Sequence, residues 1–452
     1  MDSTIETKVE RARVQFNSGI TRPIEWRREQ LRRLKQVIIE HQSQIEQALW
    51  SDLRKSPEEC YLTEISIVVQ EIDLHIRNLQ SWAKPQRVAT PIHLSPSSSY
   101  VYHEPLGVAL IIAPWNYPLQ LVVNPLIGAI SAGCTAIIKP SPDAPATAAV
   151  IQKIIDEAFS TPFIEVIIGE REQTIELLKL QYDMIFFTGS PQFGRVVYQA
   201  AAQNLTPVVL ELGGKSPCIV DKDANIEVAA RRIAWGKWIN AGQTCIAPDY
   251  LFVHRSVKGL LLKAIVDQCQ KMYGRDAATS RFYPRIVTHA AFDRIAMLTQ
   301  NESIYYGAEV DREDRYISPT IIDNITPRSK IMQEEIFGPI LPVMTFDNLD
   351  NVVAHVNSQE RPLALYYFGN NDSAVLSRCT SGGACINDTI MHISNHRLPF
   401  GGVGNSGIGR YHGKTSFEAF SNLKSVVKTP TWLDLPLRYP PFKYFKLIKR
   451  LL

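Results

Sequence analysis

One cysteine of this sequence lies in a segment with the composition of a reactive loop. The segment "NAGQTCIAPDY" covers residues 240–250 and surrounds Cys245 with Gly242, Gln243 and Thr244. Glycine permits close approach of the backbone, and a thiol among small polar side chains can meet a substrate. The remaining cysteines have no such neighbours, and a lone cysteine is more often a small buried apolar side chain; they are Cys60, Cys134, Cys218, Cys269, Cys379 and Cys385. The sequence therefore singles out Cys245 as the candidate nucleophile.

Two further segments have residue types that could act with a nucleophile. In "ELGGKSP", Glu211 ends an apolar run; it fits a helix cap or an ion pair, or a general base if burial raises its pKa. In "FFTGSPQFG", a predicted strand runs into Gly189 and Ser190, and a helix is expected after Gly194. The backbone N–H groups at a helix start can bind phosphate, but a tight strand-to-helix turn uses the same residues. The residues alone leave both pairs of interpretations open.

These candidates lie in two series of alternating strand-like and helix-like segments. Residues 8–82 show helical periodicity, and residues 84–101 are rich in Pro and Ser, which predicts an extended excursion. The first series includes "GVALIIAP", "TAIIKP", "IEVIIG", "MIFFTG" and "PVVLEL"; the second runs from Cys218 to about Asn387. Near-continuous apolar strands separated by helices indicate parallel sheets with both faces covered. We expect an α/β protein with two such domains.

Composition excludes several classes of protein. The 452 residues have a net charge of only +3, which gives no electrostatic reason to expect a nucleic-acid partner. The cysteines are odd in number and scattered, without zinc-ligand spacing, and the first residues lack a secretory signal. Residues 105–138 contain no charge, but Pro114, Pro118 and Pro125 would break a membrane-spanning helix. We expect a cytoplasmic enzyme without a metal site.

Several motifs together resemble the aldehyde dehydrogenase superfamily. They are "APWNYP", "IIKPS", "FFTGSPQFG", "LELGGKSP", "GQTCIAPDY", "QEEIFGPILP" and "PFGGVGNSGIGRYHGKTSFEAFS", in the order of that family, and they look most like its class 3, fatty-aldehyde branch. The resemblance implies two doubly wound α/β domains and a small β bridging or oligomerisation element. Residues 1–81 and 102–212 would form the cofactor-binding domain, and residues 213–405 the catalytic domain. Residues 82–101 and 406–452 would form the bridging element and C-terminal tail, through which class 3 enzymes dimerise.

The resemblance also implies a role for individual residues. Cys245 would be the nucleophile and Glu211 the base, while the Asn116 amide would stabilise an oxyanion together with the Cys245 backbone N–H. Lys139 would bind the adenosine ribose, Glu335 the nicotinamide ribose, and Phe337 would pack beside it. The other residues assigned to cofactor binding are Ile112, Trp115, Ser141, Gly189, Ser190, Gly194 and Leu212. Without the resemblance, Asn116 would pass for a turn cap, Lys139 for a lysine at a strand end, and Glu335 for a surface charge.

The implied activity is the NAD- or NADP-dependent oxidation of medium- or long-chain aliphatic, or aromatic, aldehydes to carboxylic acids. Two alternatives are a cysteine-dependent ester or thioester hydrolase, in which the cofactor segments would have no use, and a CoA-acylating dehydrogenase. The family often has Glu three residues after the "KPS" lysine, where it binds the adenosine ribose, but this chain has Pro142. Loss of that carboxylate removes repulsion against a 2′-phosphate. We therefore expect NADP to be accepted.

The C-terminal segment "PFKYFKLIKRLL" combines aromatic and aliphatic residues with four cations. As a helix it would be amphipathic and basic, as segments at membrane surfaces are, but it is too short to cross a bilayer. It could equally fold over the surface of the protein and border a substrate tunnel. Peripheral membrane contact and a tunnel rim both stay open.

Overall fold

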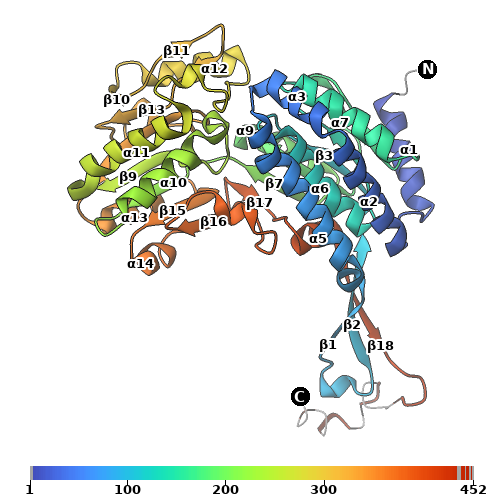
Figure 1. The fold of residues 1–452 in the computed structure, drawn as a ribbon. Helices are drawn as coiled ribbons and strands as arrows, with labels where there is room; N and C mark the ends of the chain where they lie inside the picture. Colours follow the sequence, from blue (N-terminus) through green and yellow to red (C-terminus); the bar gives the residue numbers. More distant parts are fainter. Residues whose placement is uncertain (1–3, 435–438, 443, 447–448, 450–452) are drawn as a thin grey trace.

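The structure is a computed structural model that describes residues 4–434, 439–442, 444–446 and 449. Figure 1 shows two lobes side by side and a narrow stalk that extends away from one of them. Each lobe is built on one sheet of mainly parallel strands, and the stalk is a separate three-stranded sheet. The α/β fold class predicted from the alternating segments is therefore present.

The first lobe contains most of the N-terminal half of the chain. Its strands are β3 (Val108–Ile112), β4 (Thr135–Lys139), β5 (Ile164–Val166), β6 (Met184–Gly189), β7 (Val208–Leu212) and β17 (Gly407–Ile408). Its helices are α1 (Ile5–Asn17), α2 (Ile24–Glu40), α3 (Gln42–Leu53), α4 (Pro57–Cys60), α5 (Ser66–Ala83), α6 (Pro118–Ala132), α7 (Pro145–Ala158), α8 (Arg171–Leu177), α9 (Pro191–Gln203) and α15 (Lys414–Ala419). A π-helical turn, η1 (Tyr61–Ile65), joins α4 to α5.

Alternation along the strands of the first sheet explains why helices cover both of its faces. Leu110 and Ile112 pack in a core with residues of α1 and α9, whereas Ala109 and Ile111 pack in the larger core that includes α6. The strand order is β17-β7-β6-β3-β4-β5, and all neighbours are parallel except β17, which runs antiparallel to β7. The connections therefore reverse direction between β3 and β6. In open α/β sheets ligands bind beyond the carboxyl ends of the strands at such a switch point.

The second lobe has a seven-stranded sheet in the order β10-β13-β14-β9-β8-β15-β16. Its strands are β8 (Pro217–Val220), β9 (Tyr250–His254), β10 (Ser303–Tyr306), β13 (Thr320–Asp323), β14 (Ile340–Phe346), β15 (Ala364–Phe368) and β16 (Gly383–Ile386). Its helices are α10 (Ile226–Trp238), α11 (Lys258–Tyr273), α12 (His289–Ala296), α13 (Leu349–Ser358) and α14 (Asp372–Leu376); β11 (Val310–Asp311) and β12 (Tyr316–Ile317) form a small ribbon. Residues 213–216, between β7 and β8, connect the two sheets.

Short 3-10 turns lie between these elements. They are η2 (Ile92–Leu94), η3 (Ile239–Gly242), η4 (Arg255–Val257), η5 (Ala277–Thr279), η6 (Met297–Thr299), η7 (Lys330–Met332) and η8 (Met391–Ser394). The stalk consists of β1 (Gln86–Val88), β2 (Ser98–Pro105) and β18 (Ser421–Lys428), with β2 in the centre and both pairs antiparallel. Among the described residues, the outer edges of β1 and β18 pair with no further strand, and such edges can pair with another chain.

Two expectations need correction. Helix α9 begins at Pro191, not after Gly194, because Ser190 is its N-cap and accepts a hydrogen bond from the Phe193 N–H. Segment 406–420, which was assigned to the bridging element, belongs instead to the first lobe. There it adds β17 to the edge of the sheet, and α15 packs against α6.

Among the described residues, no helix is long and apolar enough to cross a membrane. Helix α6, from the uncharged stretch, is a fully buried helix of 15 residues with Pro125 inside it. The prediction of an amphipathic C-terminal tail rests mainly on residues outside the described ones. The cytoplasmic compartment stays a prediction.

Candidate active site

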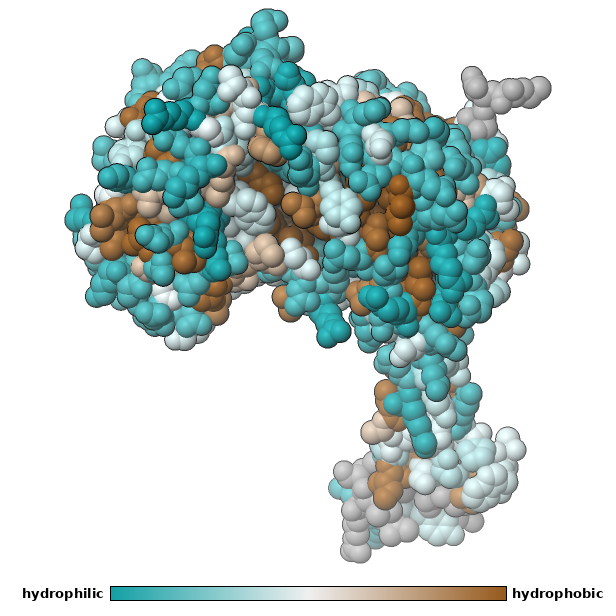
Figure 2. All heavy atoms as spheres, in the orientation of Figure 1, coloured by the Kyte–Doolittle hydropathy of each residue, from teal (hydrophilic) through white to brown (hydrophobic). Residues whose placement is uncertain are grey.

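A cavity of about 1040 Å³ lies where the strand ends of both lobes meet. Figure 2 shows hydrophobic side chains in the hollow between the lobes. The cavity is lined by Cys245, Glu211 and Asn116, and also by Trp115, Gly189, Ser190, Leu212, Glu335 and Phe337. The three predicted catalytic residues therefore share one enclosure, although they come from distant parts of the sequence.

The turn before Cys245 has an unusual backbone. Asn240, Ala241 and Gly242 all have positive φ, at 51°, 50° and 75°. A Cβ at Gly242 would lie 2.2 Å from the Gly338 carbonyl oxygen, so only glycine fits there. The next residue, Gln243, is fully buried, and its side-chain amide donates to the Asn240 and Arg285 carbonyl oxygens at 3.0 Å. This strained and anchored turn presents Cys245 to the cavity.

As whole residues, Cys245 and Cys379 are partly exposed, whereas the other cysteines are buried. Cys245 lines the cavity and Cys379 does not. Burial, followed by the nearby carboxyl groups of Glu335 and Glu211, raises the pKa of the Cys245 thiol well above its ordinary value. The thiol form is therefore stable in the resting site, and its proton has to be removed before it can attack.

Asn116 follows β3 and precedes α6, and only 2% of its surface is exposed. Its side-chain Nδ2 donates to the Gln243 carbonyl oxygen at 3.0 Å, which ties the amide to the turn before Cys245. The Asn116 Oδ1 atom is buried and, within the described chain, has no hydrogen-bond partner. An amide held beside the thiol loop with one N–H still available can donate to an oxyanion.

Glu211 is the penultimate residue of β7 and is buried. Neither of its carboxyl oxygens has a hydrogen-bond partner in the described residues, and Gly401 leaves room for the group, since a Cβ there would lie 2.9 Å from Oε1. Burial raises the pKa of Glu211 well above its ordinary value, and the charge of Arg410 opposes this only in part. An unpaired buried carboxyl beside a thiol has the properties of a general base.

Glu335 and Phe337 also line the cavity. Burial, with a contribution from Asp249, raises the pKa of Glu335 to about 8. A Cβ at Gly213 would lie 2.0 Å from the Glu335 Oε2 atom, so the link between the lobes has to be glycine for this carboxyl to enter. The rings of Phe337 and Trp115 meet edge to face, with centroids 5.4 Å apart.

The residues at the switch point fit a dinucleotide. Gly189 ends β6 and Ser190 caps the start of α9, and the buried Thr188 hydroxyl has no partner within the described chain. Gly194 permits close packing of α9 on β7, because a Cβ there would lie 2.6 Å from a methyl carbon of Leu212. These are the features of a phosphate-binding strand-to-helix turn.

Four of the predicted cofactor residues lie outside the lining of the cavity: Ile112, Lys139, Ser141 and Gly194. Ile112 and Lys139 are neighbours at the ends of β3 and β4, so they lie at the same edge of the sheet as Trp115. The Lys139 ammonium is buried and donates to the carbonyl oxygens of Pro140 at 2.8 Å and Gly169 at 2.6 Å. The Ser141 hydroxyl accepts a hydrogen bond from the Asp143 N–H at 3.2 Å.

The sequence motifs do not indicate a group of polar residues that lies at and behind the cavity wall. Lys55, Glu59 and Glu64 come from the N-terminal helical region, which had been given no role in chemistry. Asn240 and Tyr117 link this group to the turn before Cys245. The one available signal was Glu64, a charge on the same helical face as the apolar residues Val68 and Ile72.

The comparisons with known proteins agree with this geometry. The profile of the Aldehyde dehydrogenase family matches residues 2–426. The chain belongs to the aldehyde dehydrogenase family. It is therefore an oxidoreductase, and the family resemblance of the motifs is confirmed.

Two relatives and one solved structure extend over almost the whole of this aldehyde dehydrogenase. It is 48% identical over 451 residues to the 4,4'-diaponeurosporen-aldehyde dehydrogenase of Staphylococcus aureus, with 98% of each chain covered. It is 43% identical over 444 residues to the dimeric NADP-preferring aldehyde dehydrogenase of Canis lupus familiaris, with 97% of this chain and 98% of the relative covered. A substrate-bound structure of Staphylococcus aureus AldH matches it with a TM-score of 0.97 at 47% identity, covering 99% of both chains.

Proposed function

We propose that this enzyme oxidises medium- or long-chain aliphatic, or aromatic, aldehydes to carboxylic acids at Cys245, with NAD or NADP as the hydride acceptor. The observation that supports this most directly is the cavity in which Cys245, Glu211 and Asn116 meet a long apolar wall. That wall includes Leu62, Ile67, Leu121, Trp235, Met272, Phe282, Met391 and Ile393. Each CH₂ group that such a wall buries stabilises the bound aldehyde by about 0.8 kcal/mol.

Attack begins when the Cys245 thiol loses its proton to ionised Glu211 or to water. The sulfur then forms a bond to the carbonyl carbon, and the carbonyl π electrons move to oxygen, giving a thiohemiacetal anion. The Asn116 Nδ2 amide and the Cys245 backbone N–H donate to this oxyanion. Loss of one such donor typically lowers the rate by about 10²–10³-fold.

NAD or NADP, when bound, supplies the nicotinamide that accepts a hydride. Glu335, Trp115 and Phe337 would hold the nicotinamide end, and Lys139 the adenosine end, as the family resemblance implies. When the thiohemiacetal carbon has given up its hydride, Cys245 is left as a thioester of the substrate.

Glu211 then removes a proton from water, which attacks the thioester carbonyl, and the Cys245 sulfur leaves. The raised pKa of Glu211 makes it a stronger base than an ordinary carboxylate and opposes its ionisation at low pH. A base beside the thioester favours hydrolysis to the acid over transfer of the acyl group to CoA.

The test is a series of straight-chain aldehydes from short to long, together with benzaldehyde, assayed by formation of reduced cofactor. We expect kcat/KM to rise with chain length until the apolar wall is filled. Cys245→Ala should abolish the reaction, and the matched control Cys379→Ala should leave it unchanged, since Cys379 is partly exposed outside the cavity. A preference for short polar aldehydes, or full activity of Cys245→Ala, would refute the proposal.

We propose that the enzyme is a homodimer that assembles through the stalk. In support, β18 has a free edge, its side chains Leu423 and Val427 are 57% and 54% exposed, and the Canis lupus familiaris relative is named as dimeric. Sedimentation velocity of a Leu423→Asp/Val427→Asp variant tests this. We expect the wild type to sediment as a dimer and the variant as a monomer; equal sedimentation of both as dimers would place the interface elsewhere.

A further inference from the structure

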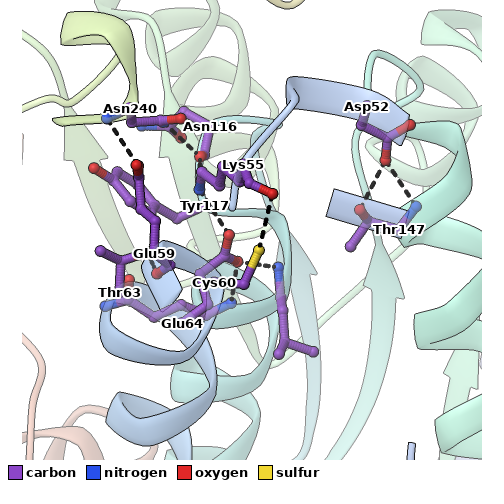
Figure 3. Close-up of polar contacts among 12 residues, drawn as sticks. Asp52, Lys55, Glu59, Cys60, Thr63, Glu64, Asn116, Tyr117, Thr147 and Asn240 are labelled. Carbon is purple, nitrogen blue, oxygen red and sulfur yellow. Dashed lines mark hydrogen bonds and ion pairs between the residues drawn. The ribbon is translucent and has the colours of Figure 1, made fainter. Parts of the chain in front are cut away.

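A buried ion pair lies behind the candidate oxyanion site (Figure 3). Lys55 and Glu64 have side chains that are 0% exposed, and the Lys55 Nζ atom lies 2.7 Å from the Glu64 Oε1 atom. Burying two charges costs several kcal/mol per ion, and their mutual attraction repays this only when further hydrogen bonds complete the geometry. The use of an ion pair here, where two apolar side chains could fill the space, needs an explanation.

The other side-chain hydrogen bonds of the pair lead to the segment that contains Asn116. Lys55 Nζ donates to the Asn116 backbone carbonyl oxygen at 2.9 Å and lies 4.1 Å from the centroid of the Tyr117 ring. Glu64 Oε2 accepts from the N–H groups of Leu119 at 2.9 Å and Gln120 at 3.3 Å, which are the first free donors of α6. The pair therefore fixes residues 116–120 at the junction of β3 and α6.

Asn116 is held from two directions as a result. Its carbonyl oxygen accepts from Lys55 and from Asn240 Nδ2 at 2.8 Å, while its own side-chain Nδ2 donates to the Gln243 carbonyl oxygen. On the far side of the turn, Glu59 Oε1 accepts from the Asn240 N–H at 2.9 Å. The π-helical turn η1 joins α4 to α5, so that Glu59 and Glu64 both face inward toward these groups. These contacts restrain the backbone of Asn116 and hold its side-chain amide beside the turn before Cys245.

We propose that Lys55 and Glu64 are positioning residues for catalysis, which hold the Asn116 peptide so that its side-chain amide meets the oxyanion formed on Cys245. The inference rests on the proposed role of Asn116. The pair touches neither the cavity nor the reacting atoms, since neither residue lines the cavity. It acts through Asn116, Tyr117 and the start of α6.

A second buried carboxylate in the same region provides a matched control. Asp52, also drawn in Figure 3, accepts from the Ala146 N–H at 3.1 Å, the Thr147 N–H at 2.8 Å and the Thr147 hydroxyl at 2.7 Å. It caps α7 as Glu64 caps α6, and it is buried to a similar degree, but it has no hydrogen bond to Asn116 or to the turn before Cys245. Asp52→Asn should destabilise the fold without changing catalysis.

The test is a double-mutant cycle of Lys55→Met with Asn116→Ala, measured as kcat with saturating cofactor and aldehyde. Misplacing a catalytic group by about 1 Å costs on the order of 10²-fold in rate, so we expect Lys55→Met to lower kcat by about 10- to 100-fold. Asn116→Ala should lower kcat by about 10²–10³-fold. In the double variant, Lys55→Met should add less than about threefold, because the amide that it positions is already gone.

Lys55→Met leaves the Glu64 Oε1 atom without its partner, and an uncompensated buried charge is strongly destabilising, so a second variant is needed. The variant Lys55→Met/Glu64→Gln removes the uncompensated charge while Asn116 still lacks its lysine donor. We expect this variant to recover much of the unfolding temperature and none of the lost kcat. The KM of the cofactor should stay within about twofold of wild type in all variants, because the effect is confined to the geometry of Asn116.

Three results would overturn the inference. The first is a double variant whose kcat loss equals the product of the two single losses, and the second is recovery of kcat together with the unfolding temperature in Lys55→Met/Glu64→Gln. The third is a loss of kcat in Asp52→Asn as large as that in Lys55→Met. If instead Asn116→Ala keeps the wild-type kcat, the proposed oxyanion role of Asn116 fails as well, and this outcome is separate from the other three.

Discussion

Glu211 and Glu64 are both buried glutamates near Asn116 or Cys245, but their surroundings are opposite. Both Glu64 oxygens are occupied, by the Lys55 ammonium and by the N–H groups at the start of α6. Both Glu211 oxygens lack partners in the described residues, and burial raises the pKa of Glu211. A buried polar group without partners is costly, so it persists where an empty bonding position has a use. The comparison supports the proposal that the partnered Glu64 holds the structure together and that the unpartnered Glu211 acts as the base.

Glu71 is a second buried glutamate whose oxygens accept hydrogen bonds, as those of Glu64 do. It is fully buried in α5 and accepts from His75 Nε2 at 3.2 Å, His396 Nδ1 at 2.6 Å and the Gly413 N–H at 2.6 Å. These hydrogen bonds outweigh the effect of burial and hold the pKa of Glu71 well below its ordinary value. Glu71 thereby fastens the segment from His396 to Gly413 to α5, and that segment includes Phe400 and Tyr411 of the cavity wall.

The largest expected effect, on kcat, comes from replacing Glu211, the proposed base. Glu211→Gln keeps the size of the side chain but cannot accept a proton from water, so we expect kcat to fall by about 10²–10⁴-fold. The acyl group should then remain on Cys245, and rapid-quench mass spectrometry of the protein should detect it as an added mass. Because Glu211 has no hydrogen-bond partner among the described residues, the unfolding temperature should not fall. A variant that turns over at the wild-type rate would exclude Glu211 as the base.

The next largest effect should come from Glu71, whose hydrogen bonds are all made to the protein itself. Its removal should lower stability and largely spare catalysis. Glu71→Gln removes a charged acceptor from three donors, and hydrogen bonds to charged groups contribute about 1.5–3 kcal/mol each. We therefore expect a free energy of unfolding lower by at least that amount in urea denaturation, while kcat per folded molecule stays within about tenfold of wild type. If Glu71→Gln instead abolished turnover and left stability intact, the division between the two classes of carboxyl would be wrong.

The candidate catalytic residues and the buried charges around them differ in how far the sequence could predict them. The alternating apolar strands predicted the α/β fold class, and the composition of its loop singled out Cys245. The roles of Glu211 and Asn116 beside it were expected only from the resemblance of their motifs to a known family. Lys55, Glu64 and Glu71 could not be assigned, because their partners are remote in sequence: Glu64 and Leu119 are 55 residues apart, and Glu71 and Gly413 are 342 apart. Periodicity places such charges on a helix without indicating which face the rest of the chain covers.

A rise in pH should change the contributions of Glu71 and Glu211 to the free energy of unfolding in opposite directions. The pKa of Glu71 is lowered in the folded state, so its stabilising contribution is present above the unfolded pKa of about 4.3 and is lost as the pH falls. The pKa of Glu211 is raised, so its folded form keeps a proton that the unfolded chain releases, and its contribution to stability decreases as the pH rises above about 4.3.

Unfolding temperatures of the two Gln variants and the wild type, measured from acid to alkaline pH, test these signs. We expect the destabilisation by Glu71→Gln to be greatest near neutral pH and to shrink in acid. Glu211→Gln should gain stability relative to the wild type as the pH rises. Parallel curves for the two variants would contradict the opposite environments that the structure gives to these carboxyl groups.

The smallest expected effect concerns a carboxylate that the chain lacks. Pro142 is partly buried three residues after Lys139, at the edge of the sheet where the adenosine ribose is proposed to bind. In Pro142→Glu, a carboxylate would accept from the ribose hydroxyls of NAD and repel the 2′-phosphate of NADP by about 1 kcal/mol, roughly fivefold, at a wet surface. We therefore expect the ratio of kcat/KM for NADP to that for NAD to fall by about this factor, and Pro142→Gln, of equal size without the charge, to change it less. The exposed Asp143 already provides one negative charge nearby, so an unchanged ratio in Pro142→Glu would mean that position 142 does not face the ribose.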